Sequence, residues 1–192
     1  MLKDEHRSPF RYPGGKASLA KLLGDVIELN FGTAGTYCEP FAGGAGAATL
    51  LLGQGRIESL HLNDADPRVF HAWETMLRQT DRFLERLDTV PLTMNEWWRH
   101  KEVIEDIRSH DAFDIGFATF YLNRTNRSGI LQKAGPIGGY AQEGKWGIDA
   151  RFNRVGLRKR IEFLSKKSDC ISLSNLDAIE FLKKPNFDLG ST

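Results

Sequence analysis

Hydrophobic positions along the chain follow two different periods. In some segments apolar residues recur every three or four positions, which predicts helices, and in others they alternate or form short apolar runs, which predicts strands. The predicted helices cover residues 17–30, 47–52, 68–77 and 178–183. The predicted strands cover residues 36–41, 56–63 and 170–173. The order of strand, glycine turn, helix, strand and acidic turn predicts the α/β class, with the first half of a doubly wound sheet.

The segment between the second and third predicted strands has a different composition. Residues 81–114 are helical in pattern and acidic, with nine Asp or Glu against five Lys or Arg, and they include the pair Trp97 and Trp98. An aromatic segment and then a glycine-rich loop follow between residues 117 and 147. Residues 151–167 hold seven basic residues and one acid, which predicts a basic helix.

Composition and charge exclude several broad classes of protein. The 192 residues give room for about one domain, and 41% hydrophobic and 27% charged residues fit an ordinary soluble protein. The net charge is +1, so any signal for nucleic acid must be local. Cys38 and Cys170 cannot form a disulfide framework and are expected to be reduced. The start of the sequence lacks the apolar core of a signal peptide, and no apolar run is long enough for a membrane helix, so we expect a cytoplasmic protein.

A glycine-rich turn and an acidic residue suggest a ligand site. Gly43, Gly44 and Gly46 lie between a predicted strand and a predicted helix, where a ligand can approach the backbone and the N–H groups of the helix start. Such turns are also often glycine-rich only for packing. Asp64 lies 18 residues after Gly46, at the end of the next predicted strand, where a carboxylate can accept both hydroxyls of a ribose. The alternative is that Asp64 caps the following helix.

The spacing of the glycines narrows the choice of cofactor. The sequence matches neither G-x-G-x-x-G nor G-x-x-x-x-G-K-[ST], which disfavours dinucleotides and nucleoside triphosphates. A cofactor with one nucleoside and no pyrophosphate fits better. S-adenosylmethionine is such a molecule.

Four sequence blocks, in this order along the chain, carry a resemblance to a known family. They are residues 10–16 (FRYPGGK), 39–46 (EPFAGGAG), 63–66 (NDAD) and 120–124 (FYLNR), with a weaker match at 175–177 (NLD). By these motifs the chain resembles DNA adenine-N6 methyltransferases of the orphan adenine-methylase type, over nearly its whole length. The resemblance implies a partial Rossmann-like S-adenosylmethionine-dependent methyltransferase sheet with an inserted, mainly helical DNA-recognition region. Residues 1–80 and 168–192 would form the cofactor-binding core, and residues 81–167 the insertion.

The resemblance also implies roles for individual residues in binding S-adenosylmethionine. Tyr12 and Lys16 would contact the methyl donor, with Lys16 at its carboxylate, although without the resemblance Lys16 is better interpreted as a solvated lysine at a helix start. Asp64 would bind the ribose, and Asp177 would approach the adenine amino group. The turn around the methionine part would consist of Glu39, Phe41, Gly43, Gly44 and Gly46.

For DNA, the resemblance implies a β-hairpin after the Leu-Asn-Arg motif, at residues 125–132, that enters double-stranded DNA. There Arg127 suits a guanine or a phosphate, and Gln132 suits an adenine. The basic helix would hold phosphates, although a single charge run is more often a solvated face. The expected DNA-binding residues are Asn123, Arg124, Arg127, Gln132, Arg154 and Arg158.

One departure from the family concerns catalysis. Family members carry Asp-Pro-Pro-Tyr at the end of a fourth strand, where it orients the target amino group and stacks on the flipped base. The sequence has no such motif, and residues 186–189 resemble only the approach to that strand. We therefore expect no catalytic residue and no metal ligand here, and an uncovered sheet edge at the strand that contains Tyr37. A truncated or frame-shifted enzyme, a split enzyme completed by a second chain, and a non-catalytic remnant that binds DNA or S-adenosylmethionine all remain open.

Overall fold

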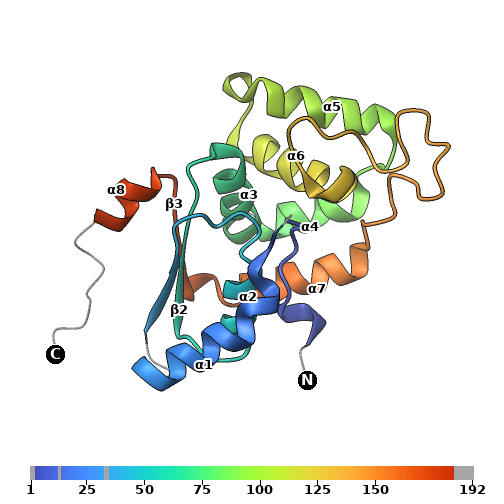
Figure 1. Cartoon of the computed structure of the whole chain (residues 1–192). Helices are drawn as coiled ribbons and strands as arrows, with labels where there is room; N and C mark the ends of the chain where they lie inside the picture. Colours follow the sequence, from blue (N-terminus) through green and yellow to red (C-terminus); the bar gives the residue numbers. More distant parts are fainter. Residues whose placement is uncertain (1–2, 13, 33–34, 184–192) are drawn as a thin grey trace.

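A computed structural model describes residues 3–12, 14–32 and 35–183. Its sheet has three parallel strands in the order β1 (Thr36–Glu39), β2 (Ser59–Asn63) and β3 (Ile171–Ser174) (Figure 1). Cys38 pairs with His61, which pairs with Ser172, so the carboxyl ends of the strands lie along one edge. The α/β class and all three predicted strands are confirmed.

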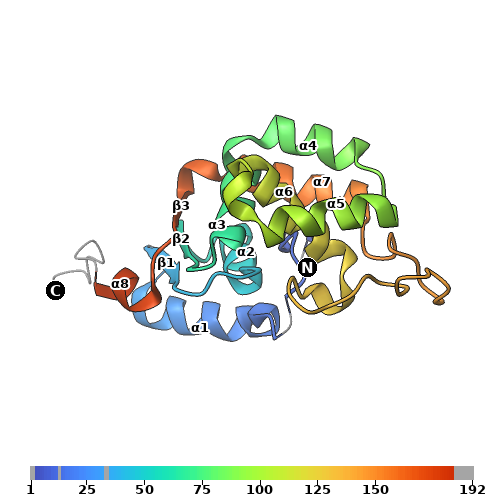
Figure 2. The same ribbon diagram turned by 90° about the horizontal axis from the view of Figure 1, so that it is seen from above.

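Helices follow the sheet strands as the hydrophobic pattern predicts. Three α-helices of the first half are α1 (Ala20–Phe31), α2 (Gly46–Gly53) and α3 (Pro67–Arg78). α3 begins where it does because the Asp66 side chain accepts a hydrogen bond from the N–H of Arg68 and Pro67 occupies the first turn. The last helix, α8 (Ala178–Lys183), lies on the side of the sheet away from α3 (Figures 1 and 2).

The middle of the chain is helical, as predicted. Its α-helices are α4 (Thr80–Thr89), α5 (Met94–Glu105), α6 (Ala112–Thr125) and α7 (Arg154–Ser165). Short 3₁₀ turns lie at Asp4–His6, Lys16–Leu19, Ile107–Ser109, Arg127–Gly129 and Ser168–Cys170. The side chains of Thr93, Asp111 and Asn153 cap the starts of α5, α6 and α7. α6 is buried along nearly its whole length, and one hydrophobic core runs from Leu60 in the sheet to Phe117 and Phe120 in α6.

Two predicted strand boundaries and the predicted burial of β1 differ from the structure. β2 starts at Ser59 rather than at residue 56, because the N–H of Arg56 bonds Leu51 and still closes the end of α2. β1 ends at Glu39, since Pro40 has no N–H to continue the ladder. β1 is also largely half-exposed rather than buried, because it lies at an edge of the sheet.

The β-hairpin expected at residues 125–132 is wrong. Instead the chain turns through Arg127–Gly129, with Ser128 at φ 56°, and makes one isolated antiparallel bridge between Asn126 and Pro136. The Asn126 amide stabilises this turn by donating to the carbonyl of Ile130. The approach to a fourth strand at residues 186–189 lies outside the described residues. Within the described ranges, no helix is both long and apolar enough to cross a membrane.

Candidate functional site

The carboxyl edge of the sheet borders a cavity of about 750 Å³, a size typical of sites for organic ligands. Its walls come from the N-terminal segment, the loop between β1 and α2, the end of β2, and helices α6 and α7. The lining residues used below are Arg7, Phe10, Arg11, Tyr12, Lys16, Ala17, Glu39, Phe41, Gly43, Gly44, Gly46, Asp64, Arg124 and Arg160.

The Asp64 carboxylate holds the glycine loop in place. Its Oδ2 accepts a hydrogen bond of 2.8 Å from the N–H of Gly43, and its Oδ1 accepts one of 3.0 Å from the N–H of Asp66. The alternative that Asp64 caps α3 is wrong, because Asp66 is the cap. An ionised carboxylate offers about four acceptor positions, so further hydrogen bonds to a ligand remain open to Asp64.

The glycines of this loop are required by the close approach of the N-terminal segment. Gly43 has φ 46°, and a Cβ on it would lie 2.9 Å from the ring of Tyr12. A Cβ on Gly44 would lie 3.0 Å from the Tyr12 Cβ, and one on Gly46 would lie 3.3 Å from that of Ala17. The Tyr12 side chain nevertheless stays half exposed at the cavity. Burial and the nearby charge of Asp64 raise the pKa of its hydroxyl.

Asn63 joins the ends of all three strands beneath the cavity. Its side-chain amide donates to the carbonyls of Pro40 and Leu176, each at 3.0 Å. Its oxygen accepts from the Ser174 hydroxyl at 2.8 Å and from the N–H of Leu176 at 3.1 Å. The side chain is fully buried, so these four hydrogen bonds fix the loops that follow the strands.

The cavity lining includes a buried acid, Glu39. Glu39 is 4% exposed, and burial raises the pKa of its carboxyl, while Lys16 and the Tyr37 hydroxyl oppose the rise. The Tyr37 hydroxyl donates to Oε1 of Glu39 at 3.5 Å. Burial and the charge of Glu39 raise the pKa of Tyr37 to about 12. Glu39 and Lys16 therefore present an anion and a cation to the same cavity.

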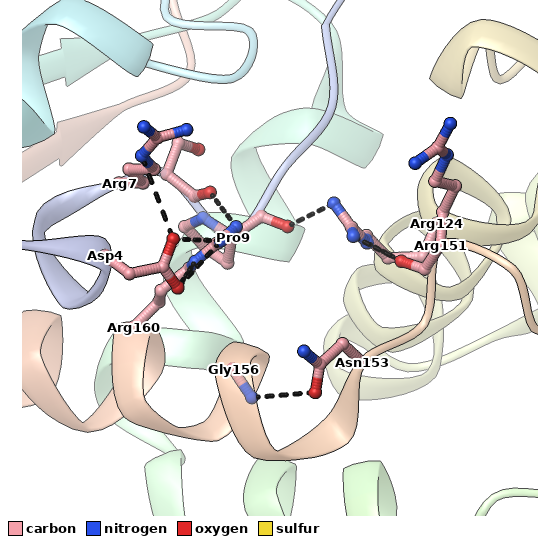
Figure 3. A network of polar contacts seen from close by, with 9 residues as sticks. Asp4, Arg7, Pro9, Arg124, Arg151, Asn153, Gly156 and Arg160 are labelled. Atoms are coloured by element: carbon pink, nitrogen blue, oxygen red, sulfur yellow. Dashed lines mark hydrogen bonds and ion pairs between the residues drawn. The ribbon is translucent and has the colours of Figure 1, made fainter.

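Four arginines also line the cavity, Arg7, Arg11, Arg124 and Arg160. Arg124 is 8% exposed, and its guanidinium lies between two backbone carbonyls (Figure 3). It donates to the Arg151 oxygen from two nitrogens and to the Pro9 oxygen at 3.4 Å. Burial, followed by the charges of Arg11, Arg160 and Arg151, lowers the pKa of Arg124 to about 9.

Eight of the nine predicted cofactor-binding residues lie together around this cavity. They are Tyr12, Lys16, Glu39, Phe41, Gly43, Gly44, Gly46 and Asp64. Asp177 does not line the cavity, and its carboxylate accepts hydrogen bonds from the N–H groups of Ile179 and Glu180 at the start of α8.

The predicted DNA-binding residues are dispersed. Asn123 is buried, where its amide bonds the backbone of Arg11 and Gly129. The side-chain oxygen of Gln132 faces Arg68 and accepts hydrogen bonds of 2.7 Å from both terminal nitrogens of its guanidinium. Arg127 is exposed.

The arginines of the basic helix have partners within the chain. Arg154 donates to the carbonyls of Leu87 and Val90, and Arg158 pairs with Asp88 and Glu162. These contacts join α7 to α4. Arg151, Lys159, Lys166 and Lys167 are the exposed cations of residues 151–167. A role of Arg154 or Arg158 at DNA phosphates stays a prediction.

Several residues of the site had no predicted role. Arg11 lies beside Tyr12 within the first sequence block, and only this position indicates that it belongs to the site. Asn63 precedes Asp64 in the acidic turn, but nothing in the sequence reveals that its amide bridges three strands. Trp73 donates from Nε1 to the Gly43 carbonyl at 2.9 Å and so supports the glycine loop from below.

Comparison with known families gives a match over most of the chain. The model of the family described as D12 class N6 adenine-specific DNA methyltransferase matches residues 12–184. No curated protein matches the chain. The matched residues contain the whole glycine loop, Asp64 and the helices α1 to α7.

Proposed function

Because the chain belongs to the D12 class N6 adenine-specific DNA methyltransferase family, we propose that its cavity binds S-adenosylmethionine as the methyl donor for DNA adenine methylation. The observation that carries the proposal is the hydrogen bond from Gly43 to Asp64, which brings a glycine loop and a carboxylate with free acceptor positions to one cavity wall.

The charged groups of the cavity match the parts of this donor. Asp64 would accept hydrogen bonds from the ribose hydroxyls. Glu39, buried and facing Lys16, would accept the α-ammonium group, while Lys16 would bind the α-carboxylate. The exposed ring of Phe41 at the cavity offers an apolar face to the adenine. When bound, the sulfonium supplies an electrophilic methyl group, and the contribution of these residues is to hold and orient it.

We further propose that the three strands are the first half of a Rossmann-like sheet, with residues 1–80 and 168–192 as the donor-binding core. Residues 81–167 would be the inserted DNA-recognition region. In support, α4 to α7 form a helical body between β2 and β3, and both parts line the cavity. The tetrapeptide Asp-Pro-Pro-Tyr occurs nowhere in the sequence, so the proposal assigns no residue of this chain to orienting the target amino group.

Calorimetric titration tests donor binding. S-adenosylmethionine is titrated into the chain, into Asp64→Ala and into Asp66→Asn. A carboxylate that accepts hydrogen bonds from two hydroxyls contributes about 1.5–3 kcal/mol to the free energy of binding. The affinity of Asp64→Ala for the donor should therefore fall by about ten-fold or more. Asp66→Asn, next to it but outside the cavity lining, should bind like the original chain. Absence of heat with the original chain contradicts the proposal.

A second candidate, binding without methyl transfer, is favoured by the missing Asp-Pro-Pro-Tyr tetrapeptide. Incubation of the chain with DNA and donor labelled in the methyl group distinguishes the two. Label in the N6 position of adenine would show that the chain transfers methyl groups. Donor binding without labelled DNA would support the second candidate, and a second chain that restores transfer would support a split enzyme.

A further inference from the structure

We propose that Arg7, Arg11, Arg124 and Arg160, called the arginine cluster below, bind one backbone phosphate of DNA inside the same cavity as the methyl donor. This inference rests on the proposed function and deepens it, because it places the DNA backbone relative to the donor. All four side chains line the cavity, and they come from the N-terminal segment, α6 and α7.

The arginine cluster has more positive charge than its surroundings balance. Asp4 is the one carboxylate among the described residues that pairs with it, at 2.8 Å from Arg160 and 3.8 Å from Arg7 (Figure 3). Arg11 and Arg124 have no carboxylate partner in the described part of the chain. Buried or partly buried charges are normally paired, so an anion belongs beside the arginine cluster.

The two unpaired guanidinium groups are held in place before any ligand arrives. The Arg11 guanidinium donates from Nη1 to the carbonyl of Asn126 at 3.4 Å. The Arg11 backbone is fixed by Asn123, whose Oδ1 accepts from its N–H at 2.8 Å and whose amide donates to its carbonyl at 2.6 Å. The Arg124 guanidinium donates hydrogen bonds to the carbonyls of Pro9 and Arg151. Three of its N–H groups are used in this way, which leaves two of the five that a guanidinium carries. Burial first, and the charges of Arg11, Arg160 and Arg151 second, lower the pKa of Arg124.

The methyl donor itself does not supply the missing anion. Its carboxylate and its ammonium group sit on the same carbon, so a carboxylate inside the arginine cluster would bring the ammonium among four guanidinium groups. Glu39 and Lys16, which interact electrostatically and line the same cavity, together accommodate both charges of the donor. A phosphodiester carries negative charge alone, and guanidinium groups bind it through paired N–H donors.

The experiment measures DNA and donor binding separately. A fluorescein-labelled DNA duplex that contains adenine is titrated with the chain, with Arg11→Gln, with Arg11→Lys and with Arg108→Gln, at several salt concentrations. Arg108 is an exposed arginine between α5 and α6 that does not line the cavity, so its variant controls for the loss of one charge. Calorimetry with S-adenosylmethionine is done on the same proteins. Arg11 is chosen over Arg124 because replacing the buried Arg124 removes contacts to Pro9 and Arg151 that hold the fold together.

Arg11→Gln should weaken DNA binding about ten-fold and lower the slope of log affinity against log salt by about one. Arg11→Lys should keep that slope, since the charge remains, and donor affinity should be unchanged in all variants. The proposal is overturned if Arg11→Gln binds DNA like Arg108→Gln, or if its donor affinity falls while its DNA affinity does not. If the original chain shows no donor binding but the DNA results hold, the proposed donor site fails and the phosphate site stands.

Discussion

The carboxylate of Asp64 and the backbone N–H of Gly43, 21 residues apart in the sequence, are joined by a hydrogen bond of 2.8 Å. The acidic turn after β2 therefore fixes the conformation of the glycine loop after β1. The same carboxylate is the group that we propose for the ribose, so binding and architecture depend on one side chain.

This double role predicts the behaviour of Asp64→Asn. The new amide can still accept from Gly43, but its NH₂ group then faces the N–H of Asp66, which Oδ1 now accepts at 3.0 Å. We expect donor binding about ten-fold weaker and a free energy of unfolding lower by about 1–2 kcal/mol. Calorimetry and urea denaturation measure the two effects. A loss of affinity with unchanged stability would mean that Asp64 does not support the loop.

Gly43→Ala tests the close approach of Tyr12. The left-handed φ of 46° costs about 1–2 kcal/mol for alanine, and the new Cβ would lie 2.9 Å from the Tyr12 ring. The ring should therefore swing out, and both stability and donor affinity should fall. Urea denaturation of Gly43→Ala, Tyr12→Ala and the double variant gives the coupling between them. The double variant should be more stable than the sum of the single effects predicts, and strict additivity would show that ring and loop do not meet.

Glu39→Gln should separate stability from binding. Burial raises the pKa of Glu39, so ionisation of this carboxyl is less favourable in the folded chain than in the unfolded one. The ionised carboxylate therefore lowers the free energy of unfolding, and this loss appears as the pH rises above the ordinary glutamate pKa of about 4.3. At neutral pH the variant should be more stable than the original chain, and the difference should vanish at pH values well below 4.3. Donor affinity should fall about ten-fold at neutral pH, since the ammonium loses its carboxylate. Glu58→Gln, at an exposed position, should change neither property.

Asn63→Ala should be among the most destabilising single changes near the site. It removes four hydrogen bonds and leaves the carbonyls of Pro40 and Leu176 without this donor. We expect the free energy of unfolding to fall by about 2–4 kcal/mol. Asn30→Ala removes one exposed hydrogen bond to Val26 and should cost less than about 0.5 kcal/mol. Equal losses in the two variants would contradict the bridging role of Asn63.

The sequence was sufficient for those parts of the fold that depend on local pattern. α3 and the three strands have clear periodicity and clear stop signals, so they lie within a few residues of their predicted positions. The glycine loop and Asp64 could be predicted as one site because each ends a neighbouring parallel strand.

Contacts between distant segments could not be predicted. Nothing local shows that Arg154 and Arg158 bind α4, because the pattern of a phosphate-binding face and that of a packed one are the same. A local hydrogen bond can also have two interpretations: Asp177, after the end of β3, caps a six-residue helix, and its expected place near the adenine stays a prediction. The turn at Ser128 was missed since serine seldom adopts a positive φ.

The hydrogen bonds that close the cavity have a consequence for the order of folding. Arg11 meets Asn123 across 112 positions of sequence, Pro9 meets Arg124 across 115, and Asp4 meets Arg160 across 156. While the chain is being synthesised, the glycine loop and Asp64 emerge long before α6 and α7. The N-terminal segment can therefore make these hydrogen bonds only after α6 and α7 have been synthesised, and contacts of such high sequence separation form late. The cavity is thus completed only after α6 and α7 have formed, long after the glycine loop and Asp64 have been translated.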